Sequence, residues 1–402
     1  MSHAGPAEAV FWTAATIIAY TYVGYPLLLY VMTRQRRSIS PAGSAWPRVT
    51  LIISAYNEKE VMAEKLLNAL ELDYPRDLLE ILVVSDASDD GTDEIVTGFE
   101  DQNVRLIRQT QRLGKSAGLN LGVGQAHGEI IIFSDANALY EPSAIRNLVR
   151  HFSEPRAGYV VGNARYSERP GQTASAESEG IYWQLETWLK EKESLFGSVV
   201  GGDGAIYAIR RELFTPLLVT DINDFLNPLQ IVSKGYRGVY DKSAVCYEEA
   251  GDSFGKEFRR KVRIVSRSIN AVFRAPRVLL PWTQPRHWLA LVSHKALRWL
   301  APVFLLILFV ATLALVKIPF YQIALWMQGV FYGMALAGWK LERRIAAPRF
   351  LYLPLYFCVV NLAALLGLFR FLTGSLAPTW ETIRQRPQQG EDSHLSLVRK
   401  DS

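Results

Sequence analysis

The pattern of apolar and polar positions divides the chain into four apolar stretches and one long polar segment. None of the four stretches contains a charged residue, and each has about the length of 20 residues that a helix needs to cross a ~30 Å hydrocarbon layer. The sequence therefore predicts one membrane-spanning helix before the polar segment and three after it, at Ala9–Met32, Leu300–Val316, Ile318–Trp339 and Phe350–Phe369.

The first stretch could instead be a cleaved secretion signal. However, its 24 uncharged residues exceed a signal core of about 7 to 15 residues, and basic residues follow it rather than precede it. Basic residues beside a span tend to stay in the cytoplasm, which predicts that the polar segment is cytoplasmic. The residues with this bias are Arg34, Arg36 and Arg37 after the first span, and Lys340, Arg343, Arg344 and Arg349 between the last two.

Within the polar segment, short β-branched runs alternate with helical patterns. This βαβα order predicts an α/β domain with an open, mostly parallel sheet and helices on both faces. Ligands of such sheets bind at the carboxyl ends of the strands. The expected strands are Val49–Ala55, Glu80–Ser85, Val104–Arg108 and Ile130–Ser134, and the expected helices are Lys59–Leu72, Thr92–Phe99, Lys115–Gln125 and Glu141–Phe152.

Beyond residue 152 the pattern predicts three more strands, two helices and a basic amphipathic helix. The strands are expected at Tyr159–Asn163, Ala205–Arg210 and Arg237–Tyr240, and the helices at Ser178–Leu195, Phe225–Lys234 and Phe254–Phe273. We therefore expect five regions: a first span with a basic linker (1–47), a cytoplasmic catalytic domain (48–253), a basic interfacial region (254–298), C-terminal spans (299–372) and a polar tail (373–402).

The positive charge of the chain is local. The net charge is +5, from 44 basic and 39 acidic residues, yet residues 256–300 alone carry eleven basic residues and one acidic residue. A basic stretch that leads into a span favours contact with anionic lipid headgroups, with phosphate groups of a ligand, or with both. No nucleic-acid-reading motif accompanies it, so we expect no nucleic-acid partner.

Two common nucleotide motifs are incomplete. Gly114, Lys115 and Ser116 resemble the end of a P-loop, but Gln109 stands where the first glycine of that loop is required. Gly122 and Gly124 begin a G-x-G inside a helix that precedes a strand, which is the reverse of the dinucleotide fingerprint. A kinase, an ATPase and a dehydrogenase are therefore disfavoured.

Seven motifs, in order over about 210 residues, instead carry a family resemblance. They are Ser54–Glu58 (SAYNE), Val83–Thr92 (VVSDASDDGT), Gly114–Asn120 (GKSAGLN), Phe133–Asn137 (FSDAN), Gly202–Arg211 (GDGAIYAIRR), Asn223–Phe225 (NDF) and Arg260–Arg263 (RKVR). The chain resembles the membrane-bound family-two glycosyltransferases, which include hyaluronan, chitin and cellulose synthases. The resemblance implies a GT-A fold and sugar transfer from a nucleotide donor.

The resemblance implies that the first motifs hold the nucleotide. Tyr56 can stack on the base, whereas Glu58 and Asp86 can accept hydrogen bonds from the base or the ribose. Alternatively, Tyr56 is a packed aromatic residue at a strand end, and Asp86 belongs to a turn. Lys115 opens a helix, where a cation is unfavourable without a nearby anion, and this favours a phosphate ligand.

Asp135 matches the first acid of the family's D-x-D metal motif. Asn137 replaces the second acid, which leaves one carboxylate and one amide oxygen. Mg²⁺ or Mn²⁺ takes oxygen ligands and can complete its shell from the diphosphate and water, so we expect weaker but retained binding. The alternative is that Asp135 only caps the following turn.

Asp224 matches the acid that serves as the general base in the family. Asn223 replaces the acid that usually precedes it, which removes a like charge from the vicinity of Asp224. The alternative is that Asp224 is the N-cap of the helix expected to start at Phe225.

Arg260 and Arg263 match the basic box of the family, and their spacing places both on one helix face, where they can hold a diphosphate. The alternative is a helix that only holds anionic lipid. Ile264 replaces the tryptophan of this box. In processive members of the family that tryptophan helps to hold the acceptor sugar, so its absence argues against repeated elongation. Trp380, Thr382 and Arg384 resemble a cytoplasmic element of hyaluronan synthases. A tail on the cytoplasmic side would require that Phe350–Phe369 does not cross fully.

The expected function is inverting, metal-dependent sugar transfer from a nucleoside diphosphate donor, with uridine as the expected base. The acceptor is a growing polysaccharide or a lipid-linked oligosaccharide at the bacterial inner membrane, where a synthase or export complex is a further possible partner. Single addition to a polyprenyl phosphate or glycolipid, and a catalytically silent scaffold, are the alternatives. Asp135, Asp224 and Lys115 together argue against a silent scaffold.

Overall fold

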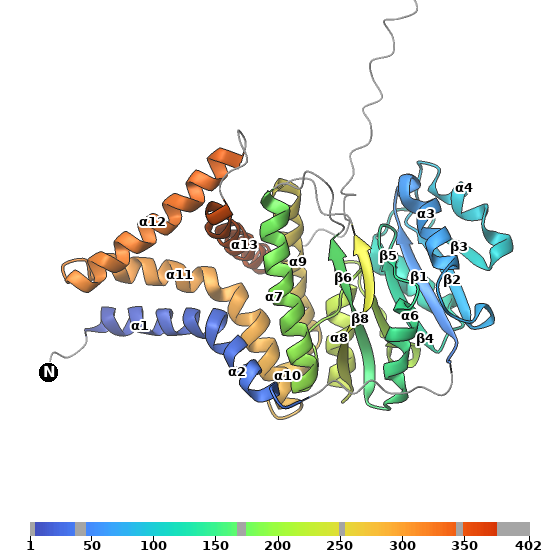
Figure 1. The fold of residues 1–402 in the computed structure, drawn as a ribbon, viewed down its shortest axis with the longest axis horizontal. Coiled ribbons are helices and arrows are strands. Elements are labelled where there is room, and N and C mark those ends of the chain that lie inside the picture. The colour runs from blue at the N-terminus through green and yellow to red at the C-terminus, as the bar shows by residue number, and fades with distance from the viewer. Residues whose placement is uncertain (1–4, 37–45, 167–173, 249–253, 343–348, 376–402) are drawn as a thin grey trace, which may run out of the picture.

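The structure, a computed structural model, describes residues 5–36, 46–166, 174–248, 254–342 and 349–375. Figure 1 shows a sheet with helices on both of its faces and, beside it, a group of helices that extends away from the sheet. The sheet domain corresponds to the long polar segment of the sequence, and the extending helices correspond to its apolar stretches.

The sheet has eight strands in the order β3-β2-β1-β4-β7-β6-β8-β5. Strands β1 to β4 pair in parallel, whereas β7 runs antiparallel to β4 and β6, and β5 antiparallel to β8. The parallel pairing of these four strands agrees with the predicted mostly parallel sheet. The strands are β1 (Val49–Ala55), β2 (Leu79–Ser85), β3 (Val104–Arg108), β4 (Ile130–Asp135), β5 (Leu139–Tyr140), β6 (Ala157–Tyr166), β7 (Tyr207–Arg210) and β8 (Arg237–Glu248).

Side chains of β1 alternate between two hydrophobic cores, one on each face of the sheet. Leu51 and Ile53 lie in the core with α3, α4 and α6, whereas Ile52 lies in the core with α5, α8 and α9. Both faces are thus covered, as a buried parallel sheet requires. The helices of this part are α3 (Lys59–Leu70), α4 (Thr92–Thr97), α5 (Lys115–Gln125), α6 (Ala144–Val149), α7 (Ala174–Phe196), α8 (Asn223–Ser233) and α9 (Phe254–Arg274).

The helix predicted from Glu141 begins later, at Ala144. Leu139 and Tyr140 pair with Tyr247 and Cys246 of β8, and the amide of Glu141 donates to the carbonyl of Val245. This pairing keeps the chain extended past the point at which local sequence favours a helix. The partner strand lies about 100 residues away, so the local pattern contains no sign of it.

Among the described residues, three helical segments are long and apolar enough to cross a membrane: Pro6–Thr33, Pro285–Ala314 and Phe350–Leu372. The first segment consists of α1 (Pro6–Ala19), the π-helical turn η1 (Tyr20–Gly24) and α2 (Tyr25–Thr33). The second consists of α10 (Pro285–Ala290), the π-helical turn η7 (Leu291–Ala296) and α11 (Leu297–Ala314). The third lies in α13 (Arg349–Leu372). The second segment begins at Pro285, upstream of the predicted start at Leu300, because α10, η7 and α11 form one continuous helix.

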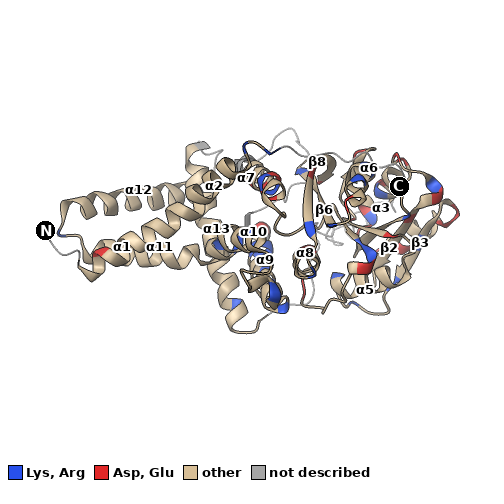
Figure 2. Cartoon of the chain, turned by 90° about the horizontal axis from the view of Figure 1, so that it is seen from below, with Lys and Arg blue, Asp and Glu red and all other residues tan. Residues whose placement is uncertain are grey.

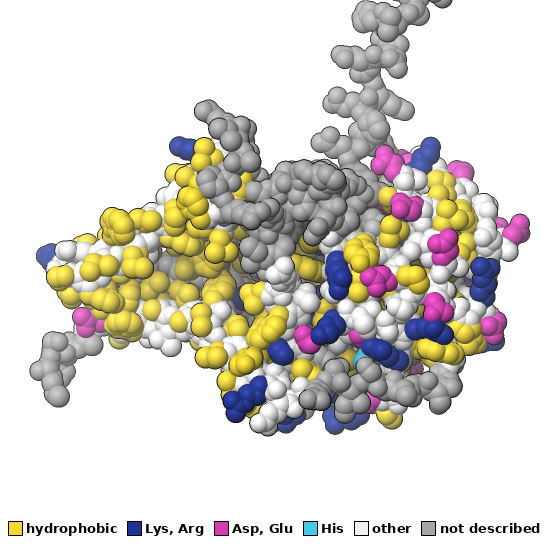
Figure 3. Space-filling model, viewed as in Figure 1, with side chains coloured by type: hydrophobic (Ala, Val, Ile, Leu, Met, Phe, Trp, Pro, Cys, Tyr) yellow, Lys and Arg dark blue, Asp and Glu magenta, His cyan; other side chains and the backbone are white. Residues whose placement is uncertain are grey.

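The remaining predicted span forms α12 (Pro319–Glu342), which is not among these three segments. It has the required length, but Gln322, Gln328 and several glycines make it less apolar than its neighbours. Figure 2 shows acidic and basic residues concentrated on the sheet domain, and Figure 3 shows a largely hydrophobic surface over the extending helices. The charge distribution thus separates a polar part from an apolar part.

The helices α7 and α9 lie between the two parts. In Figure 1, α1, α11 and α12 extend away from the sheet, whereas α7 and α9 run across that direction. Helix α13 packs along α9 and also crosses the direction of α11. Its contact with α9 is close, because a methyl group added at Gly367 would lie 2.8 Å from the side chain of Val265.

Candidate active site

Two loops at the carboxyl ends of β1 and β2 are joined by reciprocal hydrogen bonds. The side-chain amide of Asn57 donates to Asp89 (2.8 Å), and the amide of Asp89 donates back to the Asn57 side chain (3.0 Å). Next to them, the backbone amide of Glu58 donates to the hydroxyl of Thr92 (2.9 Å). The S-A-Y-N-E and D-A-S-D-D-G-T motifs therefore form one wall of the site.

Tyr56 lies at this wall under an arginine that the sequence reading did not select. The guanidinium of Arg112 lies 3.8 Å from the centre of the Tyr56 ring. A stacked ring and guanidinium form a flat surface of the kind that planar ligands contact. The interpretation of Tyr56 as a base-stacking residue remains a prediction, and Arg112 extends the predicted surface.

Asp86 organises the loop that leads into α5. Its carboxylate accepts hydrogen bonds from the side chain of Gln109 (2.7 Å) and from the amides of Leu113 (2.9 Å) and Gly114 (3.0 Å). Gly114 has a φ of 92°, which favours glycine at the entry to the helix. Burial raises the pKa of Asp86, and the backbone hydrogen bonds from Gly114 and Leu113 oppose the shift. Asp86 thus fixes the loop before α5, and its contact with the nucleotide stays a prediction.

Lys115 and Asp135 form an ion pair between the start of α5 and the end of β4. Lys115 opens the helix as predicted, and Asp135 supplies the anion that a cation needs at this position. Although burial lowers the pKa of Lys115, the pairing with Asp135 raises it on balance. Lys115, the predicted phosphate-binding residue, therefore neutralises Asp135, the predicted metal-binding residue.

Asp224 has an unused oxygen. Its Oδ1 atom is buried and has no hydrogen-bond partner among the described residues. Burial raises the pKa of Asp224, and the carboxylates of Asp203 and Asp135 add to the shift while Lys115 opposes it. Asn223 stands where the family usually has an acid beside the base. Asp203 and Asp135, which are distant in the chain, bring negative charge to Asp224 instead. A raised pKa and a free oxygen are suited to accepting a proton.

The alternative role of Asp224 as a helix cap does not hold. Helix α8 begins at Asn223, its N-cap position is Ile222, and no side chain caps it. Asp224 lies in the first turn instead, and the Asn223 side chain donates to the hydroxyl of Tyr207 (2.9 Å). The fold therefore leaves the Asp224 carboxylate available to a ligand.

The segment 202–204 crosses directly over these charged groups. The amide of Gly202 donates to the carbonyl of Asp224. A methyl group added at Gly204 would lie 3.3 Å from Asp224 Oδ2, 3.6 Å from Lys115 Nζ and 3.7 Å from Asp135 Oδ2. These distances show that Asp224, Lys115 and Asp135, which come from three separate motifs, lie close together.

The donor set at this point suits a hard cation that is shared with a diphosphate. Asp135 is 37% exposed at its side chain, and Asn137 is half-buried two residues further on. Among the described residues, no three His, Cys, Asp or Glu side chains are arranged to hold a metal alone. One carboxylate and one amide oxygen therefore fit Mg²⁺ or Mn²⁺ only if a ligand provides the remaining oxygens.

A buried lysine supports the turn that carries these two residues. Lys65 of α3 donates to the Ser134 hydroxyl (2.9 Å) and to the carbonyl of Ala138, and it lies 4.3 Å from the centre of the Tyr140 ring. Burial lowers the pKa of Lys65 to about 8. In the sequence of α3, Lys65 looks like an ordinary surface lysine, so the local pattern gives no sign of this role.

Arg260 of α9 faces the acidic residues Asp224 and Glu248. Arg263, on the same helix, lies beside another arginine, Arg267. Arg260 pairs with Glu257 (3.3 Å), and it interacts electrostatically with Asp224 and Glu248. Burial, together with the charge of Arg263, lowers the pKa of Arg267 to about 10. The structure thus brings Arg260 to the site, and the predicted role of Arg263 remains untested.

Two further acids belong to the site but were not selected from the sequence. Asp203 pairs with Lys190 of α7 (2.9 Å), and Glu248 ends β8. Burial, with the nearby carboxylates of Asp135 and Asp203, raises the pKa of Glu248 to about 8. Asp203 lies inside the quoted G-D-G-A-I-Y motif and could have been found there. Glu248 depends on the length of β8, which the local pattern ends at Tyr240.

Comparison with known proteins agrees with this geometry. Residues 50–218 match the family model described as glycosyl transferase family 2. With the sheet order and the site at its carboxyl edge, this match identifies a family-two glycosyltransferase domain on a GT-A-like fold. The family resemblance and the fold class predicted from the sequence are both confirmed.

Curated relatives include polysaccharide synthases. The chain is 24% identical over 221 residues to poly-beta-1,6-N-acetyl-D-glucosamine synthase of Staphylococcus aureus (strain COL), which covers 54% of this chain and 53% of that protein. It is 23% identical to the Staphylococcus epidermidis enzyme of the same name over the same shares. The alignment thus spans about half the length of the curated relatives it matches.

One solved structure is similar over nearly its whole length. The mannosyltransferase PcManGT from Pyrobaculum calidifontis, in complex with GDP-Man and Mn2+, has a TM-score of 0.67 and 25% sequence identity. The similarity covers 90% of this chain and 99% of that one. It therefore extends beyond the sheet domain into the helices that follow.

Proposed function

We propose that the protein transfers a sugar from a nucleoside diphosphate donor to a hydroxyl acceptor, with Asp224 as the general base. The observation that carries the proposal is the buried, unpartnered Oδ1 of Asp224 beside the Lys115–Asp135 pair. Inverting transfer requires a base that removes the acceptor proton as the acceptor oxygen attacks the anomeric carbon. The raised pKa of Asp224 suits it to this task.

The departing diphosphate needs positive charge, and the site contains two cations for it. Lys115 opens α5, and Arg260 lies on α9 across the acidic cluster. Fixed cations placed where negative charge develops stabilise the transition state without reorganisation. Tyr56 and Arg112 would stack on the base, and Glu58 and Asp86 are its predicted hydrogen-bond partners. The expected base is uridine, and guanosine is the base of the PcManGT complex.

Asp135 and Asn137 would hold Mg²⁺ or Mn²⁺ together with the diphosphate. Such an ion, when bound, neutralises charge on the leaving group. Lys115 would then leave its ion pair with Asp135 and pair with the diphosphate, because both anions compete for the same ammonium group. The Mn2+ in the PcManGT complex supports a divalent ion in this fold.

The acceptor is proposed to be a growing polysaccharide, as the names of the staphylococcal relatives suggest. Single addition to a lipid acceptor is the second candidate, and Ile264 favours it because the family's basic box has tryptophan at that place. A synthase or export complex is a further proposed partner.

The proposed location is the inner membrane, with the catalytic domain on the cytoplasmic side. Three apolar helical segments and the basic residues that flank them support this location. The basic helix α9 would lie at the membrane surface, in contact with anionic lipid, since it crosses the direction of α11. The division into the regions 1–47, 48–253, 254–298, 299–372 and 373–402 is proposed on the same grounds.

A donor panel tests the proposal. The detergent-solubilised protein is incubated with sugar nucleotides that differ in base and sugar, including UDP-linked and GDP-linked donors, and release of the nucleoside diphosphate is measured. We expect one donor to be turned over at least tenfold faster than the others. A protein that binds nucleoside diphosphates but turns over no donor, with or without Mn²⁺, would instead be a silent scaffold.

A further inference from the structure

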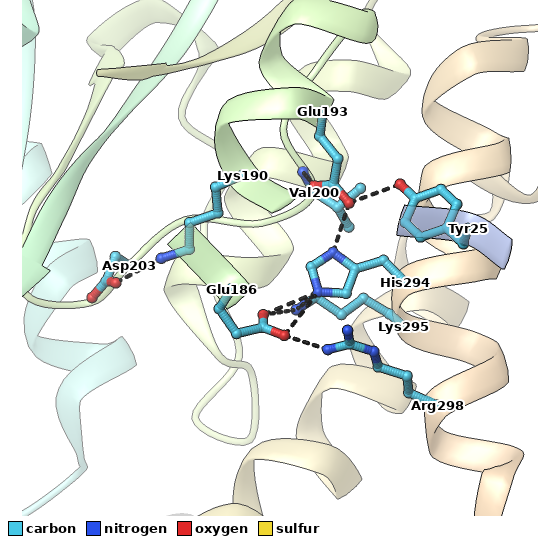
Figure 4. A network of polar contacts seen from close by, with 9 residues as sticks. All are labelled: Tyr25, Glu186, Lys190, Glu193, Val200, Asp203, His294, Lys295 and Arg298. Atoms are coloured by element: carbon cyan, nitrogen blue, oxygen red, sulfur yellow. Dashed lines mark hydrogen bonds and ion pairs between the residues drawn. The ribbon is translucent and has the colours of Figure 1, made fainter. Parts of the chain in front are cut away.

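A buried polar cluster joins the apolar helices to the sheet domain. Figure 4 shows its centre, where His294 of η7 lies between two glutamates of α7. Glu186 and Glu193 are seven residues apart, which is two helical turns, so both carboxylates face the same side. Glu193 is completely buried, and Glu186 and His294 are nearly so. Such groups are expensive to bury unless every partner is present.

Both ring nitrogens of His294 contact a carboxylate. Nδ1 lies 2.6 Å from Glu193 Oε1, and Nε2 lies 3.0 Å from Glu186 Oε2. Although burial raises the pKa of each glutamate, the nearby cationic groups lower it on balance. Each carboxylate thus has one ring nitrogen of His294 as a close polar partner. Lys295 and Arg298 complete the charge around Glu186.

The two glutamates differ in what else they hold. Among the described residues, Glu186 forms hydrogen bonds or ion pairs with His294, Lys295 and Arg298, which all lie on one apolar helical segment. Glu193 also accepts a hydrogen bond from the hydroxyl of Tyr25 in α2 (2.9 Å). Its second oxygen, Oε2, accepts from the backbone amide of Val200 (3.0 Å). Glu193 is therefore the point where two apolar helices and a loop of the sheet domain meet.

The loop that Glu193 holds is the one that crosses the candidate active site. Two residues after Val200, the amide of Gly202 donates to the carbonyl of Asp224. Asp203, next in the chain, pairs with Lys190, which lies one turn from both glutamates on α7. Gly204 follows, and a methyl group added there would lie 3.3 Å from Asp224 Oδ2. Helix α7 thus holds the loop at two points, as Figure 4 shows.

We propose that Glu193 is a positioning residue for sugar transfer: it fixes the 197–204 loop, and through it Asp224, relative to the apolar helices. A lipid-linked or membrane-bound acceptor approaches from those helices. The base must therefore be held at a fixed place with respect to them as well as to the nucleotide. This role rests on the proposed function of the site, in which Asp224 removes the acceptor proton.

Glu193→Gln and Glu186→Gln form a matched pair. Each removes one carboxylate from His294, so both should lower the unfolding temperature. Only Glu193→Gln also weakens the bond to Val200, because an amide oxygen is a poorer acceptor than a carboxylate. We expect kcat to fall about tenfold or more in Glu193→Gln and to stay within about threefold of wild type in Glu186→Gln. The affinity for the nucleoside diphosphate should stay within about twofold in both.

Hydrogen exchange of the 197–204 amides provides a readout that does not depend on turnover. These amides should exchange faster in Glu193→Gln than in wild type, and at the wild-type rate in Glu186→Gln. Equal loss of kcat and equal exchange in the two variants would overturn the proposal and leave the cluster as a scaffold. If wild type turns over no donor, the proposed function fails, and the exchange comparison alone decides the role of Glu193.

If Glu193→Gln does not fold, Glu193→Asp replaces it. The aspartate keeps the charge beside His294 but is one methylene too short to reach Val200 at the same time. It should show the same faster exchange of the loop. A wild-type exchange rate in Glu193→Asp would contradict the proposal.

Discussion

Gly204 lies where any side chain would touch three charged groups of the site. An added methyl group would be 3.3 Å from Asp224 Oδ2 and 3.6 Å from Lys115 Nζ. These ends can move, so Gly204→Ala should fold normally but displace the base and the phosphate ligand. We expect kcat to fall about tenfold or more, since small misplacements of reacting groups are costly. Steady-state kinetics with the donor found in the panel measures this.

Gly124 provides the matched control for that substitution. It lies inside α5, and nothing lies within 4 Å of a methyl group added there. Gly124→Ala should leave kcat unchanged and stabilise the protein by up to about 1 kcal/mol, the helix preference for alanine over glycine. Equal kcat values for Gly204→Ala and wild type would mean that the segment 202–204 does not approach the reacting groups.

Metal dependence is the second test at the residue scale. A chelator should abolish turnover, and Mn²⁺ or Mg²⁺ should restore it. Asn137→Asp adds a second carboxylate to the one supplied by Asp135, so it should tighten Mn²⁺ binding about tenfold in the presence of the nucleoside diphosphate. Titration calorimetry measures the affinity. Full turnover in excess chelator would remove the ion from the mechanism.

Among individual residues, the sequence pointed to several that lie inside motifs, although it missed Asp203, and it gave no sign of those that depend on distant pairing. Lys115, Asp135 and Asp224 come from three family motifs and lie close together, at the start of α5, the end of β4 and the first turn of α8. Arg112 reaches the site on a loop that Asp86 holds, and Glu248 reaches it at the end of a strand twelve residues long. Neither feature has a local sequence signal.

At the scale of single elements, α9 can hold a diphosphate, anionic lipid or both. Arg260 faces Asp224 and Glu248, whereas Arg267 lies beside Arg263. A guanidinium that binds two phosphate oxygens is not replaced by lysine, but attraction to lipid headgroups depends mainly on charge. We therefore expect Arg260→Lys to weaken nucleoside diphosphate binding about tenfold, or about 1.4 kcal/mol, and Arg267→Lys to change it less than twofold.

Calorimetric titration of the diphosphate into each variant decides between the two roles of α9. Unchanged affinity in Arg260→Lys would make α9 a membrane-surface helix only and leave Lys115 as the phosphate ligand. A loss confined to Arg263→Lys would show that the helix turns a different face to the nucleotide than the ligand-free structure indicates.

Elements were predicted best where local and distant preferences agree. Helix α5 begins and ends at the predicted residues, since Gly114 and the β-strands on either side fix both ends locally. Helix α6 begins three residues after the predicted Glu141, because β5 pairs with β8 first. Strand β8 continues past Tyr240 for the same reason, since β6 and β5 pair with its second half.

For the whole molecule, the direction of α13 bears on the membrane topology. The N-terminal end of α1 and the turn between α11 and α12 lie at the end farthest from the sheet, whereas α13 crosses this direction and packs on α9. If α13 lies along the membrane surface, the segment after Leu372 is on the same side as the sheet domain. A reporter fused after residue 402 should then be active in the cytoplasm.

The control for that experiment is a reporter fused after Lys317, in the turn between α11 and α12, which should be active outside the cytoplasm. An external reporter after residue 402 would show that α13 crosses the membrane. In that case the likeness of Trp380, Thr382 and Arg384 to a cytoplasmic element would be accidental. These three residues lie outside the described part of the chain.

The central claim is that Asp224 is the base of sugar transfer, and the kinetics of Asp224→Asn test it most directly. With the donor found in the panel, turnover should fall by a factor of roughly 10² to 10⁴, because the amide cannot take the acceptor proton. The affinity for the nucleoside diphosphate should stay within about twofold of wild type. Turnover within a few-fold of wild type, with the diphosphate still bound, would contradict the account.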